Sequence, residues 1–297
     1  MSHSHVHSHS HTHTEVEIKG SRLIFVVALN FVITIAQTVG GLYSGSLSLI
    51  SDALHNFSDG VAIMISYFAI RISKRGRDHK RTYGYKRSSI LAAALNSIAL
   101  IVISILLFKE AITKLIFPQA VNGGIVIWVA LLGLLANAAG MLLLRKFSKG
   151  DMNIKSSYIH LLSDALSSAA VVVGGILIYF FNLYWVDPVL TLLIGFLVLR
   201  ESYEIVKRAA NILMQGTPEH IDTKMILNEL KKIEQVKKID HVHVWGLDEK
   251  NVNFEAHVYV TDVKVSETKP IIAEIEKVLH ENGINHVTIQ VQVHDQG

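Results

Sequence analysis

Two histidine–aspartate pairs repeat the same spacing within long apolar stretches of the sequence. His55 precedes Asp59 by four residues, and His160 precedes Asp164 by four residues in a separate stretch. Residues four apart lie on the same face of an α-helix, about one turn apart along its axis. If the two faces oppose each other, two imidazole nitrogens and two carboxylate oxygens converge on a single point.

A set of two imidazoles and two carboxylates is typical of a tetrahedral divalent metal site, and zinc is the usual occupant. Cadmium and cobalt are further candidates, whereas manganese and magnesium prefer more oxygen ligands in octahedral geometry. The two carboxylates also cancel the charge of the ion, so that a dication can reside in an apolar interior. One pair alone also fits a hydrogen bond that fastens two helices, or a proton relay, but the repetition favours the four-ligand site.

The same apolar stretches contain other polar residues. Asp52 lies three residues before His55 and shares its helical face. It fits a role in guiding an ion or relaying a proton, and equally that of a charge at the start of a helix. Most of the amides are expected to form hydrogen bonds between membrane helices; they are Asn30, Gln37, Asn56, Asn96 and Asn137.

The elements that carry these residues are predicted to span a membrane. Of the 297 residues, 50% are hydrophobic and 18% are charged, compared with about 25% charged in soluble domains. The absence of cysteine excludes disulfide scaffolds and thiolate metal sites, and a net charge of +3 is too small to indicate nucleic-acid binding. Six apolar segments have about the 20 residues that a membrane helix needs; they are 23–43, 47–72, 88–108, 125–144, 158–181 and 186–205.

Basic residues are distributed unevenly among the connections. They concentrate before the first segment, between the second and third, between the fourth and fifth, and after the sixth, whereas the other connections contain only Lys109 and Lys114. The positive-inside rule then places both termini in the cytoplasm. We therefore expect three parts: a disordered His-rich cytoplasmic tail over 1–19, a transmembrane transport domain over 20–210 and a cytoplasmic domain over 211–297.

The last part has the hydrophobic periodicity of a small α/β domain. Helical and alternating patterns follow one another in the order α-β-β-α-β, which predicts an open sheet covered by two helices. In that sheet the valines would point to the core, and His241, His243, His257 and His294 would lie together on the opposite face. Such a patch fits cytosolic metal sensing, or simply the polar residues that solvent-facing strand positions accept.

The run from Ser46 to Asp59, together with His160-Leu161-Leu162-Ser163-Asp164, resembles the cation diffusion facilitator family. The sequence is most similar to the bacterial zinc exporters that carry His-x-x-x-Asp on both ligand helices. The resemblance implies a homodimer with six membrane helices per subunit and a cytoplasmic domain of metallochaperone-like fold. It also implies that zinc leaves the cytoplasm across the inner (plasma) membrane in exchange for protons.

Two stretches depart from the family pattern. In the connection around Asp78 and His79, one histidine lies within a basic run, so we expect a lipid-facing loop rather than a second metal site. At the family's cytoplasmic zinc site this chain offers Asp240, Gln290 and Gln292 beside His257. The tail, with alternate histidines from His3 to His13, fits collection of zinc near the entrance and equally a dispensable metal buffer.

Together these features predict a proton-coupled exporter of zinc, with cadmium or cobalt as further cargo. The alternative is a membrane metal receptor that reports zinc occupancy through the cytoplasmic domain. We expect neither enzymatic activity nor a cofactor other than the transported ion. The sequence shows no Walker-type phosphate loop, and four protein ligands would leave zinc no open position for a catalytic water.

Overall fold

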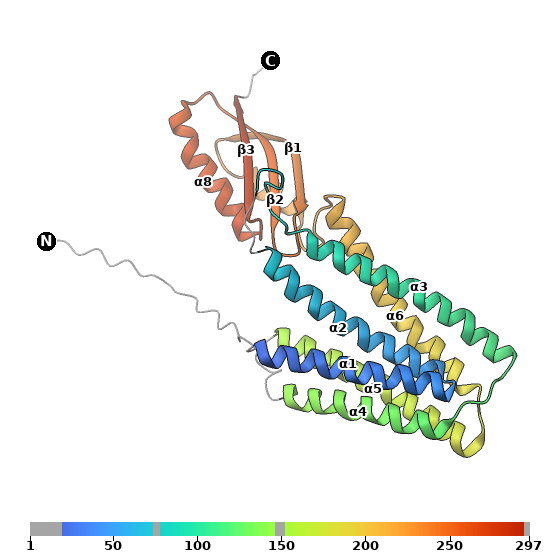
Figure 1. The fold of residues 1–297 in the computed structure, drawn as a ribbon. Coiled ribbons are helices and arrows are strands. Elements are labelled where there is room, and N and C mark those ends of the chain that lie inside the picture. Colours follow the sequence, from blue (N-terminus) through green and yellow to red (C-terminus); the bar gives the residue numbers. More distant parts are fainter. Residues whose placement is uncertain (1–19, 74–77, 146–151, 294–297) are drawn as a thin grey trace.

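The protein is described here from a computed structural model, over residues 20–73, 78–145 and 152–293. The His-rich tail and His294 lie outside the described residues. Six long helices precede a smaller α/β domain in the described part of the chain (Figure 1). The helices are α1 (Gly20–Ser44), α2 (Leu47–Ser73), α3 (Ser88–Ile116), α4 (Gly123–Arg145), α5 (Met152–Phe181) and α6 (Val186–Leu213).

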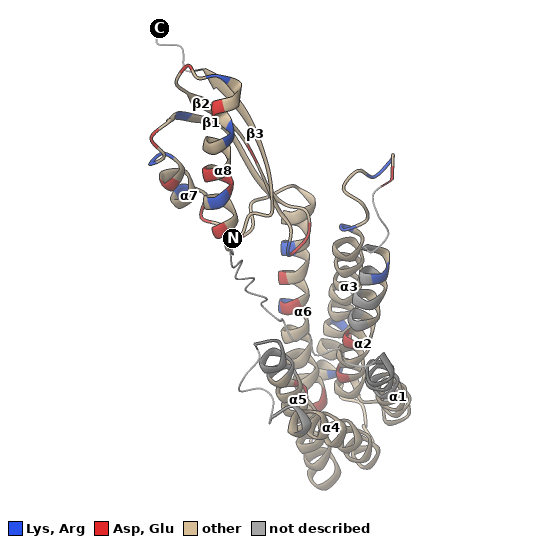
Figure 2. Ribbon diagram, turned by 90° about the vertical axis from the view of Figure 1, so that its left-hand side faces the viewer, with Lys and Arg blue, Asp and Glu red and all other residues tan. Residues whose placement is uncertain are grey.

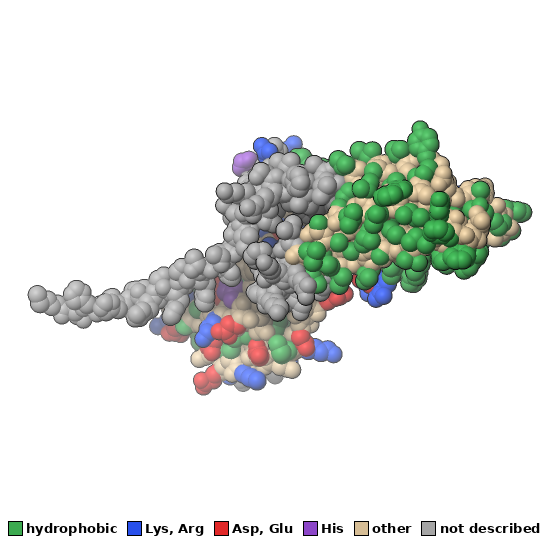
Figure 3. Space-filling view, turned by 90° about the horizontal axis from the view of Figure 1, so that it is seen from below, with side chains coloured by type: hydrophobic (Ala, Val, Ile, Leu, Met, Phe, Trp, Pro, Cys, Tyr) green, Lys and Arg blue, Asp and Glu red, His purple; other side chains and the backbone are tan. Residues whose placement is uncertain are grey.

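The long helices pack as a bundle in which α4 lies along α5, α3 along α6 and α1 along α2. Their outward-facing side chains are large and apolar, and include Leu42, Leu106, Trp128, Leu135 and Phe196. Figure 3 shows this apolar surface over the helical part, whereas charged side chains gather on the smaller domain. An apolar exterior around helices, whose backbone groups are paired internally, is what a bilayer requires.

Three stretches of the described residues are long and apolar enough to cross a membrane: Ser88–Ile116, Gly123–Leu142 and Leu161–Phe181. The third helix is longer than the predicted segment 88–108, because it continues through Lys109 and Lys114 to Ile116. The Lys114 side chain is buried, and its Nζ donates a hydrogen bond to the carbonyl oxygen of Gly45 at 2.9 Å. The charge is thus tolerated because it satisfies a carbonyl in the turn between α1 and α2.

The C-terminal domain contains α7 (Thr223–Leu230), β1 (Val236–Gly246), β2 (Val252–Val260), α8 (Val265–Glu281) and β3 (His286–Val293). The strands lie in the order β1-β2-β3, with an antiparallel first pair and a parallel second pair. The parallel pair is connected through α8, as such a pair requires a crossover. The core between helices and sheet includes Ile226, Leu230, Phe254, Ile275 and Leu279.

This structure confirms the predicted fold class, a helical membrane domain followed by a small α-β-β-α-β domain. In Figure 2 the Lys, Arg, Asp and Glu residues concentrate on the C-terminal domain and at the helix ends nearest to it. The bodies of the helices carry few charged residues. Those few therefore single out the part of the bundle where chemistry can occur.

Candidate metal site between α2 and α5

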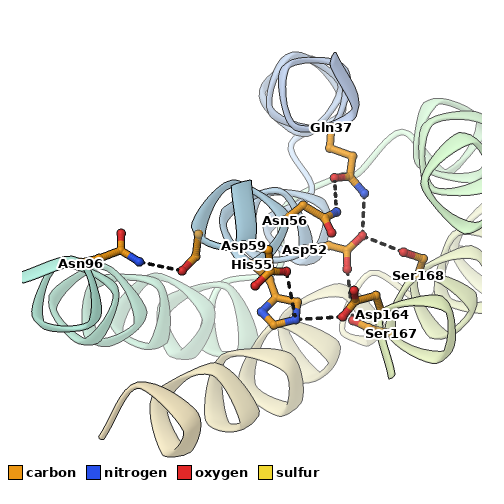
Figure 4. Close-up of polar contacts among 10 residues, drawn as sticks. Gln37, Asp52, His55, Asn56, Asp59, Asn96, Asp164, Ser167 and Ser168 are labelled. Carbon is orange, nitrogen blue, oxygen red and sulfur yellow. Dashed lines mark hydrogen bonds and ion pairs between the residues drawn. The ribbon is translucent and has the colours of Figure 1, made fainter. Parts of the chain in front are cut away.

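His55, Asp59 and Asp164 converge where α2 faces α5 (Figure 4). The Nε2 atom of His55 lies 3.1 Å from Oδ1 of Asp164 and 3.9 Å from Oδ2 of Asp59. The candidate ligand atoms of the three residues all lie within 4.8 Å of one another. Among the described residues, this is the one group of three or more histidine and acidic side chains that meets so closely.

The three side chains are well shielded from solvent. The exposed fractions are 16% for the His55 side chain, 22% for Asp59 and 5% for Asp164. His55 and Asp59 come from one face of α2, as their spacing predicts, and Asp164 comes from α5. One imidazole and two carboxylates in this arrangement present one nitrogen and two oxygens to a shared point, a donor set that suits zinc.

The fourth predicted ligand, His160, belongs to α5 one turn before Asp164. Its side chain lies outside the described residues. The structure therefore places three of the four predicted ligands.

One turn along α2 from this group, Asp52 is buried within a polar cluster. Its carboxylate accepts hydrogen bonds from Gln37 Nε2 at 2.6 Å, Ser168 Oγ at 3.0 Å and Ser167 Oγ at 3.1 Å. Asn56 Nδ2 in turn donates to Gln37 Oε1 at 2.9 Å. The cluster links α1, α2 and α5, so Asp52 is a fully bonded interhelical group rather than an exposed charge at the start of a helix.

The other intramembrane amides differ in their partners. Asn96 Nδ2 donates to Ser58 Oγ at 3.0 Å, a hydrogen bond between α3 and α2 that agrees with the prediction (Figure 4). The side chain of Asn30 lies outside the described residues. Nδ2 of Asn137 is buried and has no hydrogen-bond partner among the described residues, so this amide nitrogen is an exception to the general expectation.

Asp187 of α6, which our sequence analysis missed, anchors the start of α2. The carboxylate has 0% exposure. It accepts hydrogen bonds from the backbone nitrogens of Leu47 at 2.8 Å and Ser48 at 3.2 Å, and from the hydroxyls of Ser46 and Ser48. An anion at a helix N-terminus satisfies unpaired N–H groups and interacts favourably with the helix dipole. The available signal was a carboxylate inside an apolar segment, directly before Pro188.

The predicted histidine patch of the C-terminal domain is brought together in part. The ring centroids of His241 and His243 are 4.6 Å apart, and those of His241 and His257 are also 4.6 Å apart. A bulge between Asp240 and His243 places His241 in a left-handed backbone conformation, with φ of 50°. The rings are adjacent, but their nitrogens do not form a convergent group like the one around His55; His294 lies outside the described residues.

Asp240, beside these histidines, is held by an ion pair. Its Oδ2 lies 2.7 Å from Nζ of Lys238. This hydrogen bond lowers the pKa of the Asp240 carboxyl and raises that of the Lys238 amine. On the same domain, the amide of Gln292 lies 3.5 Å from Nδ1 of His257.

The connection before α3 is folded around Asp78. Its carboxylate accepts hydrogen bonds from the backbone nitrogens of Lys80 at 2.8 Å and Arg81 at 2.6 Å, and from the Tyr85 hydroxyl at 3.0 Å. The Tyr85 hydrogen bond is the main reason that the pKa of the Asp78 carboxyl is lowered. The ring of Tyr83 meets that of His286 edge to face, with centroids 6.4 Å apart, so this connection touches the C-terminal domain.

The arrangement of a helical bundle, an internal His–Asp group and an α/β domain agrees with the comparison with known proteins. Residues 23–214 match the cation efflux transmembrane domain, and residues 218–294 match the cytoplasmic domain of cation efflux proteins. The chain belongs to the cation efflux family. The resemblance to the cation diffusion facilitators noted from the sequence is thereby confirmed.

Several bacterial members of the cation efflux family resemble the whole chain. The "Cadmium, cobalt and zinc/H(+)-K(+) antiporter" of Bacillus subtilis is 35% identical, over 90% of this chain and 88% of the relative. The "Metal cation efflux system protein CzcD" of Cupriavidus metallidurans is 35% identical, over 90% of this chain and 84% of the relative. The "Zinc transporter ZitB" of Escherichia coli is 32% identical, over 91% of this chain and 87% of the relative. By name these relatives are an antiporter, an efflux protein and a transporter of metal ions. This chain is a membrane protein of the same family.

Proposed function

We propose that this cation efflux protein exports zinc from the cytoplasm in exchange for protons, with cadmium and cobalt as further substrates. The observation that carries the proposal is the convergence of His55, Asp59 and Asp164 inside the bundle. His160, at the matching spacing on α5, is proposed as the fourth ligand. The named substrates of the relatives support the same ions.

The chemistry of these ligands supports exchange for protons. Zinc is bound by neutral imidazole and ionised carboxylate, so that binding of the metal releases protons and protonation releases the metal. The approach of His55 Nε2 to carboxylate oxygens of Asp164, at 3.1 Å, and Asp59, at 3.9 Å, supports the proposal that these groups share a proton when no ion is bound. If the site binds zinc when it is open to one side of the membrane and protons when it is open to the other, each cycle exchanges zinc for protons, which is antiport.

The proposed orientation follows from the charges and the domain match. We propose an inner-membrane protein with both termini in the cytoplasm, because basic residues concentrate on the side of the bundle that carries the C-terminal domain. The match of residues 218–294 to the cytoplasmic domain of the family supports this side. A homodimer is proposed as well, because the matched family is one of dimerisation domains by name.

We also propose that the histidines of the sheet bind cytosolic zinc and thereby regulate transport. The stacked and edge-to-face rings of His241, His243 and His257 support this role, since small rotations of the side chains would turn their nitrogens toward one ion. His294, close in sequence to the end of β3, is proposed as a fourth member.

The test is metal flux into vesicles that contain the purified protein, with zinc, cadmium, cobalt and manganese compared under an imposed pH gradient. The wild-type protein should transport zinc, and Asp59→Ala and Asp164→Ala should each abolish transport while the protein remains in the membrane. Ser163→Ala is the matched control, because this neighbour of Asp164 on α5 is exposed. Normal zinc transport by both aspartate variants would refute the proposed site.

A further inference from the structure

Two buried polar groups in the helical bundle have no hydrogen-bond partner among the described residues. They are Nδ2 of Asn137 on α4 and Oγ1 of Thr34 on α1, in residues that are 5% and 7% exposed. Burying such groups unpaired costs free energy, and inside a membrane no bulk water can compensate. Because buried polar groups are normally hydrogen-bonded, we expect these two groups to find a partner in another state of the protein.

The packing of α4 on α5 places Asn137 at the level of Asp164. A Cβ atom on Gly133 would lie 3.6 Å from Oγ of Ser168, and one on Gly140 would lie 3.1 Å from Cδ1 of Leu161. Asn137 follows Gly133 by four residues and precedes Gly140 by three, and Asp164 stands in the same relation to Ser168 and Leu161. Because the two helices run antiparallel, Asn137 and Asp164 occupy matching positions between these contacts.

The packing of α1 on α4 brings Thr34 to the same level. A Cβ atom on Gly133 would lie 2.8 Å from Nε2 of Gln37, and one on Gly40 would lie 2.8 Å from Cγ2 of Val129. Thr34 lies three residues before Gln37, and Asn137 lies four residues after Gly133. The two unpaired groups therefore lie at the depth of the candidate metal site, on two helices that pack against each other.

The neighbouring turn shows what such groups do when they have a partner. There the side chains of Gln37 on α1 and of Ser167 and Ser168 on α5 all donate to the Asp52 carboxylate. One turn away, at the level of Asp164, Asn137 and Thr34 are the donors that lack a hydrogen-bond partner among the described residues.

We propose that Asn137 is a positioning residue for the metal site, and that Thr34 donates a second hydrogen bond to the same ligand. Their two donors hold the Asp164 carboxylate in its metal-binding orientation when Asp164 turns from His55 toward a bound zinc ion. The hydrogen bonds reach the carboxylate from α1 and α4, whereas the metal faces it from α2. The inference rests on the proposed function, and it assigns Asn137 and Thr34 no direct contact with the metal.

Hydrogen bonds to a ligand that itself binds the metal fix the orientation of that ligand, and their loss costs about 10- to 100-fold in metal affinity. The proposal therefore predicts that loss of the Asn137 amide weakens zinc binding but leaves the maximal rate of transport nearly unchanged. Asn137→Leu should raise the half-saturating zinc concentration by about 10-fold or more, with little change in the maximal rate. Thermal stability of the metal-free protein should not fall, because the variant removes an unpaired buried donor rather than a bonded one.

The experiment is zinc flux against zinc concentration in vesicles containing the full-length protein, with thermal unfolding in detergent measured with and without zinc. Asn96→Leu is the matched control, because it removes another intramembrane amide, one whose partner is Ser58 and not the metal site. Thr34→Val should act in the same direction as Asn137→Leu. The double variant should lose less than the product of the two single losses, since both act on one carboxylate.

Three outcomes would overturn the proposal: an unchanged half-saturating concentration in Asn137→Leu, an equal rise in Asn96→Leu, or a drop in the stability of metal-free Asn137→Leu. If leucine prevents production of the protein, Asn137→Ala is judged by the same criteria. Failure of the wild-type protein to transport zinc would instead refute the proposed function, so the two failures are distinguishable.

Discussion

The carboxylate of Asp187 on α6 accepts a hydrogen bond from the backbone nitrogen of Leu47, the first residue of α2, at 2.8 Å. The same carboxylate also bonds Ser46 and Ser48. Since α2 carries both His55 and Asp59, this contact between residues 140 positions apart ties the start of the ligand helix to α6. The orientation of the proposed metal site therefore depends on a group at one end of the bundle.

Replacement of this anchor should weaken both stability and transport. Asp187→Ala would leave the backbone N–H groups of Leu47 and Ser48 without their acceptor, at a cost of about 1–3 kcal/mol for each buried group left unpaired. We expect a lower thermal midpoint in detergent and slower zinc flux in vesicles. Asp262→Ala, which removes an exposed carboxylate of the C-terminal domain, is the control. An unchanged midpoint would show that the anchor contributes nothing to stability.

The imidazole of His55 should set the preference for zinc. In His55→Asp, an oxygen ligand replaces nitrogen, and oxygen-rich sites favour harder ions such as manganese. We expect manganese flux to rise relative to zinc, and discrimination of zinc from cadmium to weaken. Competition assays in vesicles measure both ratios, with His79→Asp in the exposed connection before α3 as the control. Unaltered ratios in His55→Asp would argue against His55 as a ligand.

Transport should depend on the pH of the side from which zinc is loaded. Neutral imidazole and ionised carboxylate are the forms that bind zinc, so protons compete with the metal at low pH. The half-saturating zinc concentration should therefore fall as the pH on that side rises from about 6 to about 8, the range in which histidine changes its charge. Initial rates measured at fixed pH on the other side of the membrane test this. A concentration that is the same at both pH values would mean that zinc and protons do not share the site.

Zinc binding by the C-terminal domain should depend on the histidine cluster. We expect His241→Ala/His257→Ala, made in full-length Asp164→Ala protein, to lower the amount of zinc bound at equilibrium. The Asp164→Ala background removes the contribution of the membrane site, and His220→Ala, an exposed histidine outside the cluster, is the control. Calorimetric titration of the detergent-solubilised proteins gives the stoichiometry. Equal binding by the double-histidine variant and the control would limit the cluster to a polar surface.

The pattern of the sequence was sufficient to predict the parts of the protein that depend on local order. Hydrophobic segments of spanning length predicted the long helices, and alternation predicted the strands, because burial follows the repeat of each element. The spacing of His55 and Asp59 placed both on one face of α2 for the same reason. The helix ends were less well predicted, since the extension of α3 through Lys114 depends on the carbonyl of Gly45 in another turn.

The tertiary structure alone decided which faces meet. A one-dimensional repeat states which residues share a face, but not which neighbouring helix covers it, and so it did not show that Asp164 approaches His55 or that Asp52 is fully bonded. For the same reason, the sequence did not predict that Asp187 anchors the start of α2, or that Thr34, Asn137 and Asp164 lie at one level. These contacts join segments that are distant in the sequence through hydrogen bonds and through close packing at glycines such as Gly133. Both depend on how the helices pack in the assembled bundle rather than on any one helix.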